Sequence, residues 1–166
     1  SMFAKKIKMT KNILFLCIAL MGISVIAQNT YVPDDNFEQA LIDLGYDSGT
    51  LDDYVPTAKI NTIKSLNLYK KGIKNLTGIE DFTALEAVYV RNNELTSLDF
   101  SKNLNLITIV AHYNKISSVD VSKNVLLKDF YANTNEITNL DLSKNIALTT
   151  LDVGNNQLSS IDVSVH

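Results

Sequence analysis

Hydrophobic side chains recur with a fixed period over the second half of the chain. Stretches of 21 residues align without a gap from Leu85, Leu106, Leu127 and Leu148, and the end of the sequence cuts the fourth short. Apolar residues occupy the first, fourth, sixth, eleventh, fourteenth and sixteenth positions, and asparagine occupies the ninth. Alternation of apolar and polar residues is typical of a half-buried strand. Units of this length cannot bury a core alone, so they are predicted to stack as coils.

Each coil is predicted to contain two extended segments, because its second half repeats the spacing of its first half. The first segments of successive coils should pair in parallel and point alternate side chains into the core. The ninth-position asparagines lie where the chain must turn. Their amides are predicted to bond backbone groups that would otherwise be buried without a partner. These residues are Asn93, Asn114, Asn135 and Asn156.

The spacing L-x-x-L-x-L-x-x-N-x-L resembles that of leucine-rich repeat proteins. The period, the segment 76–80 and the opening V-P-D-x-x-F-x-x-A-L at residues 32–41 are similar to those of secreted bacterial proteins of the internalin type. The resemblance covers residues 31–165. It implies a β-rich leucine-rich repeat solenoid with a parallel sheet on its concave face and an N-terminal helical cap. The array is predicted to span residues 60–166 in about five coils, the first of which is divergent and has Lys71 in place of the turn asparagine.

Residues 28–59 are predicted to form the cap and its connection to the array. Asp34 or Asp35 is the expected N-cap of a short helix, with Glu38 as a capping-box partner, and Gly45 ends the helix. Residues 47–59 are expected to be a polar connection, and their carboxylates lack the spacing of a calcium loop. One apolar face of the helix should cover the first coil, and it is made by Phe37, Ala40, Leu41 and Leu44.

Residues 1–27 have the pattern of a secretory signal peptide. Four lysines precede an apolar run over residues 13–26, and cleavage is predicted after Ala27. A membrane anchor is the alternative, but the run is shorter than the roughly 20 residues of a spanning helix. The only cysteine, Cys17, lies in this segment, so the exported chain would form no disulfide. Losing the four lysines takes the formal net charge from −3 to −7, which argues against nucleic acid and anionic membranes as partners.

The outward side chains of the main strands are the candidate binding residues. Tyrosine offers a rigid apolar ring and one hydroxyl, which suits contact with a protein. Tyr69, Tyr89 and Tyr131 are predicted to share one column, and the alternative role for these rings is cross-strand packing. Arg91, His112 and Asp129 are predicted to form a charged row. The full candidate set is Tyr69, Tyr89, Arg91, His112, Asp129, Tyr131, Asn133 and Asp152.

Catalysis and metal binding are not expected. His112, Asp129 and Thr108 lie on an open strand surface that has no means of excluding water, and a lone histidine is a poor metal site. On the opposite side Asp99, Asp120, Asp141 and Asp162 form a second column. Lysines three residues further on are predicted to neutralise it. Calcium is the alternative, but the loops are not rich in glycine. No cofactor is expected.

The predicted function is protein–protein recognition through the concave face by an exported module, at the bacterial surface or outside the cell. The alternatives are carbohydrate binding, with the tyrosines stacked on sugar rings, and a purely structural spacer. The last coil has no apparent cover. The natural protein is therefore expected either to continue with further repeats or a C-terminal sorting domain, or to pair there with another molecule.

Overall fold

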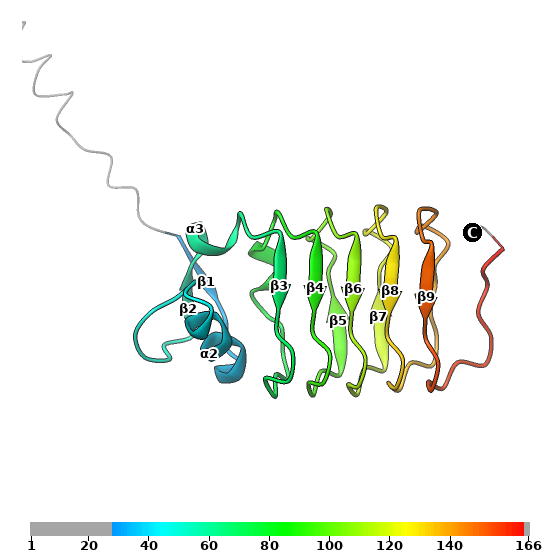
Figure 1. The fold of residues 1–166 in the computed structure, drawn as a ribbon, viewed down its shortest axis with the longest axis horizontal. Coiled ribbons are helices and arrows are strands. Elements are labelled where there is room, and N and C mark those ends of the chain that lie inside the picture. The colour runs from blue at the N-terminus through cyan, green and yellow to red at the C-terminus, as the bar shows by residue number, and fades with distance from the viewer. Residues whose placement is uncertain (1–27, 165–166) are drawn as a thin grey trace, which may run out of the picture.

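The computed structural model describes residues 28–164, in which a small cap leads into a solenoid of stacked coils (Figure 1). The predicted signal peptide lies outside the described residues. The main sheet has five parallel strands in the order β3-β4-β6-β8-β9, each from one coil (Figure 1). The strands are β3 (Ser65–Asn67), β4 (Ala87–Tyr89), β6 (Thr108–Val110), β8 (Asp129–Tyr131) and β9 (Thr150–Asp152).

The core follows the apolar period. The central residue is fully buried in the first four strands, as in Leu66 and Phe130, whereas Leu151 in β9 is half-buried. On the opposite side of the coils, β5 (Ser97–Asp99) pairs in parallel with β7 (Ser118–Asp120). The prediction of two extended segments is therefore confirmed for these two coils. The first coil has no strand at this place within the described residues, and the 3-10 helix η1 (Ile79–Asp81) follows just beyond it.

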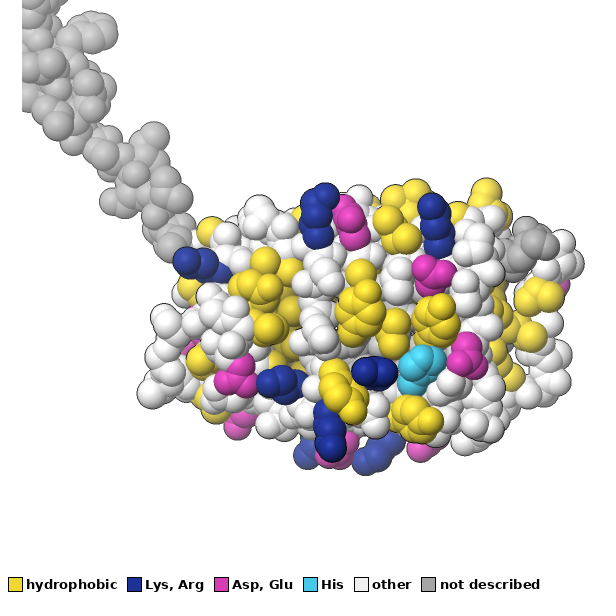
Figure 2. All heavy atoms as spheres, viewed as in Figure 1, with side chains coloured by type: hydrophobic (Ala, Val, Ile, Leu, Met, Phe, Trp, Pro, Cys, Tyr) yellow, Lys and Arg dark blue, Asp and Glu magenta, His cyan; other side chains and the backbone are white. Residues whose placement is uncertain are grey.

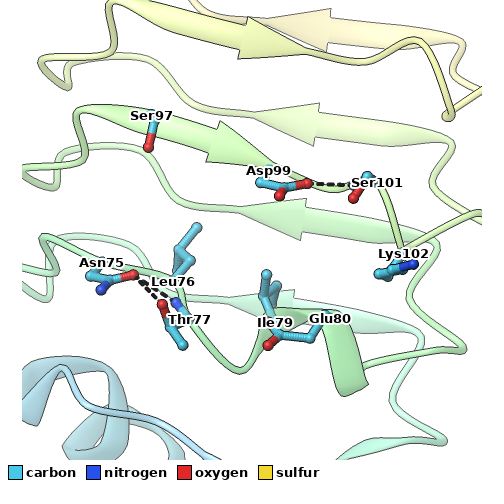
Figure 3. Close-up of a pocket in the computed structure, with 9 residues that line it drawn as sticks. All are labelled: Asn75, Leu76, Thr77, Ile79, Glu80, Ser97, Asp99, Ser101 and Lys102. Carbon is cyan, nitrogen blue, oxygen red and sulfur yellow. Dashed lines mark hydrogen bonds between the residues drawn. The ribbon is translucent and has the colours of Figure 1, made fainter.

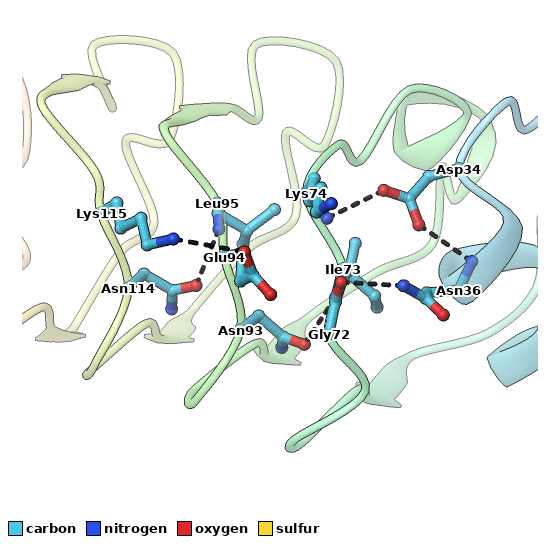
Figure 4. A network of polar contacts seen from close by, with 10 residues as sticks. All are labelled: Asp34, Asn36, Gly72, Ile73, Lys74, Asn93, Glu94, Leu95, Asn114 and Lys115. Carbon is cyan, nitrogen blue, oxygen red and sulfur yellow. Dashed lines mark hydrogen bonds and ion pairs between the residues drawn. The ribbon is translucent and has the colours of Figure 1, made fainter.

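The ninth-position asparagines bind the backbone as predicted. The Asn93 amide nitrogen donates to the carbonyls of Leu68 and Val90 at 2.8 and 2.9 Å. Its Oδ1 accepts from the backbone of Lys71 and Ile73, and Figure 4 shows the bond from Ile73. A second ladder lies at the nineteenth position, where the second half of the coil repeats the asparagine of the first half. There each side-chain amide donates to carbonyls of the preceding coil, and its members are Asn103, Asn124 and Asn145.

The residue before each ninth-position asparagine, or before Lys71 in the first coil, adopts the left-handed conformation, with φ between 52° and 57°. The repeat thus makes a tight turn at its eighth position in every coil. Asparagine tolerates this backbone better than other non-glycine residues, and a β-branched residue is the least suited to it. The residues concerned are Lys70, Asn92, Tyr113, Thr134 and Asn155.

The cap contains the predicted helix, α2 (Asp35–Asp43), with Asp34 as its N-cap. The predicted capping box is wrong. The buried Glu38 carboxylate instead accepts hydrogen bonds from the backbone of Asp52 and Asp53 at 2.8 and 3.1 Å, because the connection folds back over the helix. That connection also contains more structure than expected. It includes β2 (Tyr54–Pro56), which pairs antiparallel with β1 (Asn29–Tyr31), and α3 (Thr57–Ile60).

The cap is fixed to the first coil by apolar and polar contacts. Phe37 stacks on Phe82 with ring centroids 6.3 Å apart. Asp34 accepts from Lys74 N and Asn75 N at 2.8 and 3.0 Å through Oδ2, while its Oδ1 caps α2 (Figure 4). Gly78 packs so closely on β1 that an added Cβ would lie 2.8 Å from the Tyr31 carbonyl oxygen. The cap therefore seals the N-terminal end of the core.

Candidate recognition surface

The outward side chains of the main sheet form three columns, fixed by the strand register. The first column runs through Ser65, Ala87, Thr108, Asp129 and Thr150, and the second through Asn67, Tyr89, Val110, Tyr131 and Asp152. A third column follows two residues later with Tyr69, Arg91, His112, Asn133 and Gly154. Figure 2 shows this face, where apolar side chains run along the middle and charged ones gather around them.

The register corrects two predicted groupings. Tyr89 and Tyr131 share the second column, but Tyr69 lies in the third, because alternate residues of a strand belong to different columns. Asp129 is in the first column, so it forms no row with Arg91 and His112. Its carboxylate instead accepts a hydrogen bond from the Thr108 hydroxyl at 3.2 Å.

Neighbouring residues of the third column are held in place by aromatic rings. The Arg91 guanidinium carbon lies 4.5 Å from the centre of the Tyr69 ring, which is a cation–π contact. The His112 ring lies 5.6 Å from that of Tyr131 and 6.5 Å from that of Tyr113. Tyr113 is 55% exposed and belongs to this surface, although the sequence reasoning missed it. Its eighth-position place in the repeat, at the end of the sheet, is the signal that would have found it.

Polar contacts stiffen the end of this surface near β9. Asn133 donates to the Asp152 carboxylate at 2.5 Å. Asn133 Oδ1 and His112 Nδ1 are buried, and neither has a hydrogen-bond partner within residues 28–164. Two neighbouring coils therefore each contain a buried polar atom without a partner at the third column. In the same residue range, no three His, Cys, Asp or Glu side chains come together as a metal would require.

The opposite face has a different and uniform chemistry. The carboxylates of Asp99, Asp120 and Asp141 each accept a hydrogen bond from the backbone N–H of the serine two residues further on, at 2.8 to 2.9 Å. These backbone N–H groups, followed by the serine hydroxyls, lower the pKa of all three carboxyls. The lysines three residues further on also lower these pKa values, as neutralisation requires, but they come after the serine groups in size.

Ion pairs lie around the rims of the coils. Lys64 contacts Glu86 at 2.8 Å, and this hydrogen bond raises the pKa of Lys64. Lys71 contacts Asp43 of the cap at 2.9 Å and, with Gln39, lowers the pKa of that carboxyl. Such exposed pairs contribute little to stability. Within the described residues, no ion pair lies in the middle of the main sheet.

No family model and no curated protein sequence matches the chain. Among solved structures, it is similar to the functional domain of InlJ from Listeria monocytogenes, which includes a cysteine ladder. The identity is 33% and the TM-score is 0.76, over 84% of this chain and 31% of that one. The described chain is an internalin-like leucine-rich repeat solenoid. The chain spans about a third of the length of the InlJ domain. That domain includes a cysteine ladder, whereas residues 28–164 of this chain contain no cysteine.

Two further structures have a similar fold, and they support only the fold of this internalin-like solenoid. An internalin, InlF from Listeria monocytogenes, is 21% identical with a TM-score of 0.63, over 86% of this chain and 50% of that one. A leucine-rich repeat protein from Leptospira interrogans is 20% identical with a TM-score of 0.59, over 63% and 28%. Among residues 28–164, no helix has the length and apolar character needed to cross a membrane.

Proposed function

We propose that this chain is an exported recognition module that binds a protein partner through the outward, concave face of its main sheet. The observation that carries the proposal is the difference between the two outward faces. The return strands repeat serine and aspartate from coil to coil, as at Ser97 and Asp99 in β5 and Ser118 and Asp120 in β7. The main sheet has a different residue in nearly every coil at each column.

Variation between coils indicates which positions the fold does not require, because every coil has the same core and the same turn. Positions that the fold requires, such as the core residues and the turn asparagines, are repeated along the array. The second column contains Tyr89, Val110 and Tyr131 on successive strands, where the fold would equally accept small polar residues. Strands lie about 4.8 Å apart, so these three side chains form one continuous apolar strip. Such a strip suits the aromatic centre of a protein interface.

Preorganisation adds to the case for a protein partner. Arg91 is held over the Tyr69 ring, and His112 is held between Tyr113 and Tyr131. These side chains lose little conformational freedom when a partner docks, which removes part of the entropic cost of binding. Arg91 lies nearer the cap, and Asp129 and Asp152 lie nearer the last coil. The partner is therefore expected to place acidic groups toward the cap and basic groups toward the other end.

A panel of purified extracellular proteins and a glycan array, screened in parallel, test the proposal. The double variant Tyr89→Ala/Tyr131→Ala should weaken a protein hit by about 30-fold or more, as removal of two interface anchors does. The return-face variant Ser97→Ala/Ser118→Ala should leave the affinity unchanged. Circular dichroism should show that both variants fold. A hit that survives the tyrosine variant would refute the assigned face, and glycan-only binding would replace the proposal by carbohydrate recognition.

Export is tested separately. The proposal expects the chain, expressed with its own N-terminus in a bacterium, to be processed to a form that begins at Gln28. N-terminal sequencing of material from the medium or the cell surface checks this. Protein that stays in the cytoplasm with residues 1–27 intact would contradict the export part alone.

A further inference from the structure

A hollow of about 400 Å³ lies on the return side of the solenoid, between the first coil and β5 (Figure 3). Its floor is apolar and is made by Leu76 and Ile79. Its polar wall is made by Asn75, Thr77, Glu80, Ser97, Asp99 and Lys102. A volume of this order is that of a ligand site. The hollow is separate from the main sheet face, since β5 belongs to the other sheet.

The cap creates this hollow by drawing the first coil away from β5. The backbone N–H groups of Lys74 and Asn75 bind Asp34 of the cap, and Gly78 packs against β1. Hydrogen bonds join the first coil to the second coil on either side of the gap. Glu94 N donates to Ile73 O at 2.8 Å on one side, and Asn103 donates to Ile79 O at 2.8 Å on the other. The gap between these bonds is therefore built into the fold.

The edge of β5 that borders the hollow has no strand beside it, because β5 pairs only with β7 in the described chain. The next coil shows what such an edge binds when a strand is present, since Ser117 N donates to Thr96 O at 3.0 Å. The equivalent donor in the second coil, Thr96 N, has no acceptor within residues 28–164. An open strand edge is a template for an extended chain.

The charged residues around the hollow indicate which side chain a bound extended segment would carry. Glu80 lies across the gap from Asp99 and Ser101, and Lys102 lies at the far end beyond Ser101 (Figure 3). Glu80 uses Oε2 to accept from Gly78 N at 2.8 Å, and its Oε1 has no hydrogen bond in the described chain. Glu80 and Asp99 both line the hollow, and a space bordered by two carboxylates favours a cationic group.

We propose that this hollow binds a short extended peptide segment that carries a lysine or arginine side chain. The peptide backbone pairs with the free edge of β5, and its cation lies between Glu80 and Asp99. Lys102, at the end of the site, faces an acidic or carboxy-terminal group of the same peptide. This inference is independent of the proposed role of the main sheet face.

Nuclear magnetic resonance titration of the ¹⁵N-labelled protein tests the site with defined probes. The probe is an acetylated five-residue peptide of alternating serine and valine, with lysine at its centre and a free carboxy terminus. Adding this peptide should shift the amide signals of protein residues 75–80 and 96–102. The matched peptides carry glutamate at the centre, or N-methyl groups on the backbone nitrogens that would pair with β5. Both should bind at least ten-fold more weakly.

Variants of the protein give the second arm. Glu80→Gln/Asp99→Asn should weaken the lysine peptide at least ten-fold, and asparagine retains the oxygen that accepts from Ser101. The control Asp120→Asn/Asp141→Asn changes the same kind of carboxylate outside this hollow and should leave the affinity for the peptide unchanged. The variant Tyr89→Ala/Tyr131→Ala should also leave it unchanged. The proposal is overturned by an absence of shifts, by shifts on the main sheet face, by equal binding of the N-methylated peptide, or by a saccharide that binds where the peptide does not.

Discussion

Replacing Asn135 by alanine should destabilise the protein more than replacing Asn145, although both asparagines are buried in the same coil. Asn135 uses both ends of its amide, because Oδ1 accepts from Ile116 N at 3.0 Å and Nδ2 donates to three carbonyls. Asn145 uses one end, because Nδ2 donates to two carbonyls at 2.9 Å and Oδ1 has no partner in the described chain. The two ladders look alike in sequence but differ in what their removal leaves unpaired.

The expected difference follows from the partners that survive each truncation. All five carbonyls keep another hydrogen-bond donor in either variant, from Asn114, Asn156, Tyr113 N, Asn124 N or Leu127 N. The decisive group is the N–H of Ile116, which has a single acceptor and is orphaned by Asn135→Ala. A buried unsatisfied N–H costs about 1–3 kcal/mol. Asn145→Ala also removes an oxygen that is already unpaired. Asn135→Ala is therefore expected to lower the free energy of unfolding by about 1–3 kcal/mol more than Asn145→Ala.

Urea unfolding followed by far-UV circular dichroism measures this difference, with equal m-values as the check that the transitions are comparable. Amide hydrogen exchange adds a local readout, since protection of the Ile116 amide should fall in Asn135→Ala and persist in Asn145→Ala. Equal losses in the two variants, or unchanged protection at Ile116, would refute the assignment of the stability to this hydrogen bond.

Three further predictions concern backbone strain and charge. Gly78→Ala should lower the free energy of unfolding by about 2–4 kcal/mol, because φ is 102° and the new Cβ would meet β1. Gly45→Ala, at φ 78° with open space around it, should lower it by about 1 kcal/mol. Thermal unfolding of the two variants compares these losses. Thr134→Asn should stabilise by about 0.5–1 kcal/mol and Asn92→Thr should destabilise by a similar amount, since both sites have left-handed backbone; equal midpoints would contradict this. The carboxyls of Asp99, Asp120 and Asp141 have lowered pKa values, so their stabilisation is present above the unfolded-state pKa of about 3.9 and is lost as the pH falls through the folded values. Replacing all three by asparagine should flatten the dependence of the urea midpoint on pH below about pH 4, and an unchanged slope would show that they do not titrate with folding.

The repeat period was enough to predict the coils, the parallel sheet and the buried positions. Each coil solves the same packing problem, so one copy of the pattern supports the interpretation of the others. Ala111 and Ala132, small residues at the sixth position, are as buried as the larger residues elsewhere in that column. The ninth-position asparagines were predictable for the same reason, because a turn inside a stack leaves backbone groups that only an inward amide can reach.

The surface required the register as well as the period. Tyr69 was grouped with Tyr89 on residue type, yet the two lie in different columns because Asn67 is the residue opposite Tyr89. Counting along the strands would have separated them. The aspartate column likewise depends on a contact that its charges alone do not indicate. The bond from the Ser101 N–H to Asp99 is a local turn contact two residues long, and it outweighs the more distant lysine.

Glu38 shows what local sequence could not reveal. The spacing from Asp35 fits a capping box, and the helix does begin there. The carboxylate is nevertheless used by Asp52 N and Asp53 N, which reach it only after the connection has folded over the helix. A contact between residues that far apart depends on the path of the whole cap.

The cap substitutes for a preceding coil, and the manner of that substitution explains why the N-terminal end differs from the middle of the array. In the third coil, Ser117 N binds a carbonyl of the coil before it. At the equivalent place in the first coil, Lys74 N binds the side chain of Asp34. One carboxylate can satisfy two neighbouring N–H groups, but it cannot supply the row of acceptors that would hold this segment as a strand. The first coil therefore turns toward the cap and leaves β5 open, so the contacts that seal the core also produce the hollow beside it.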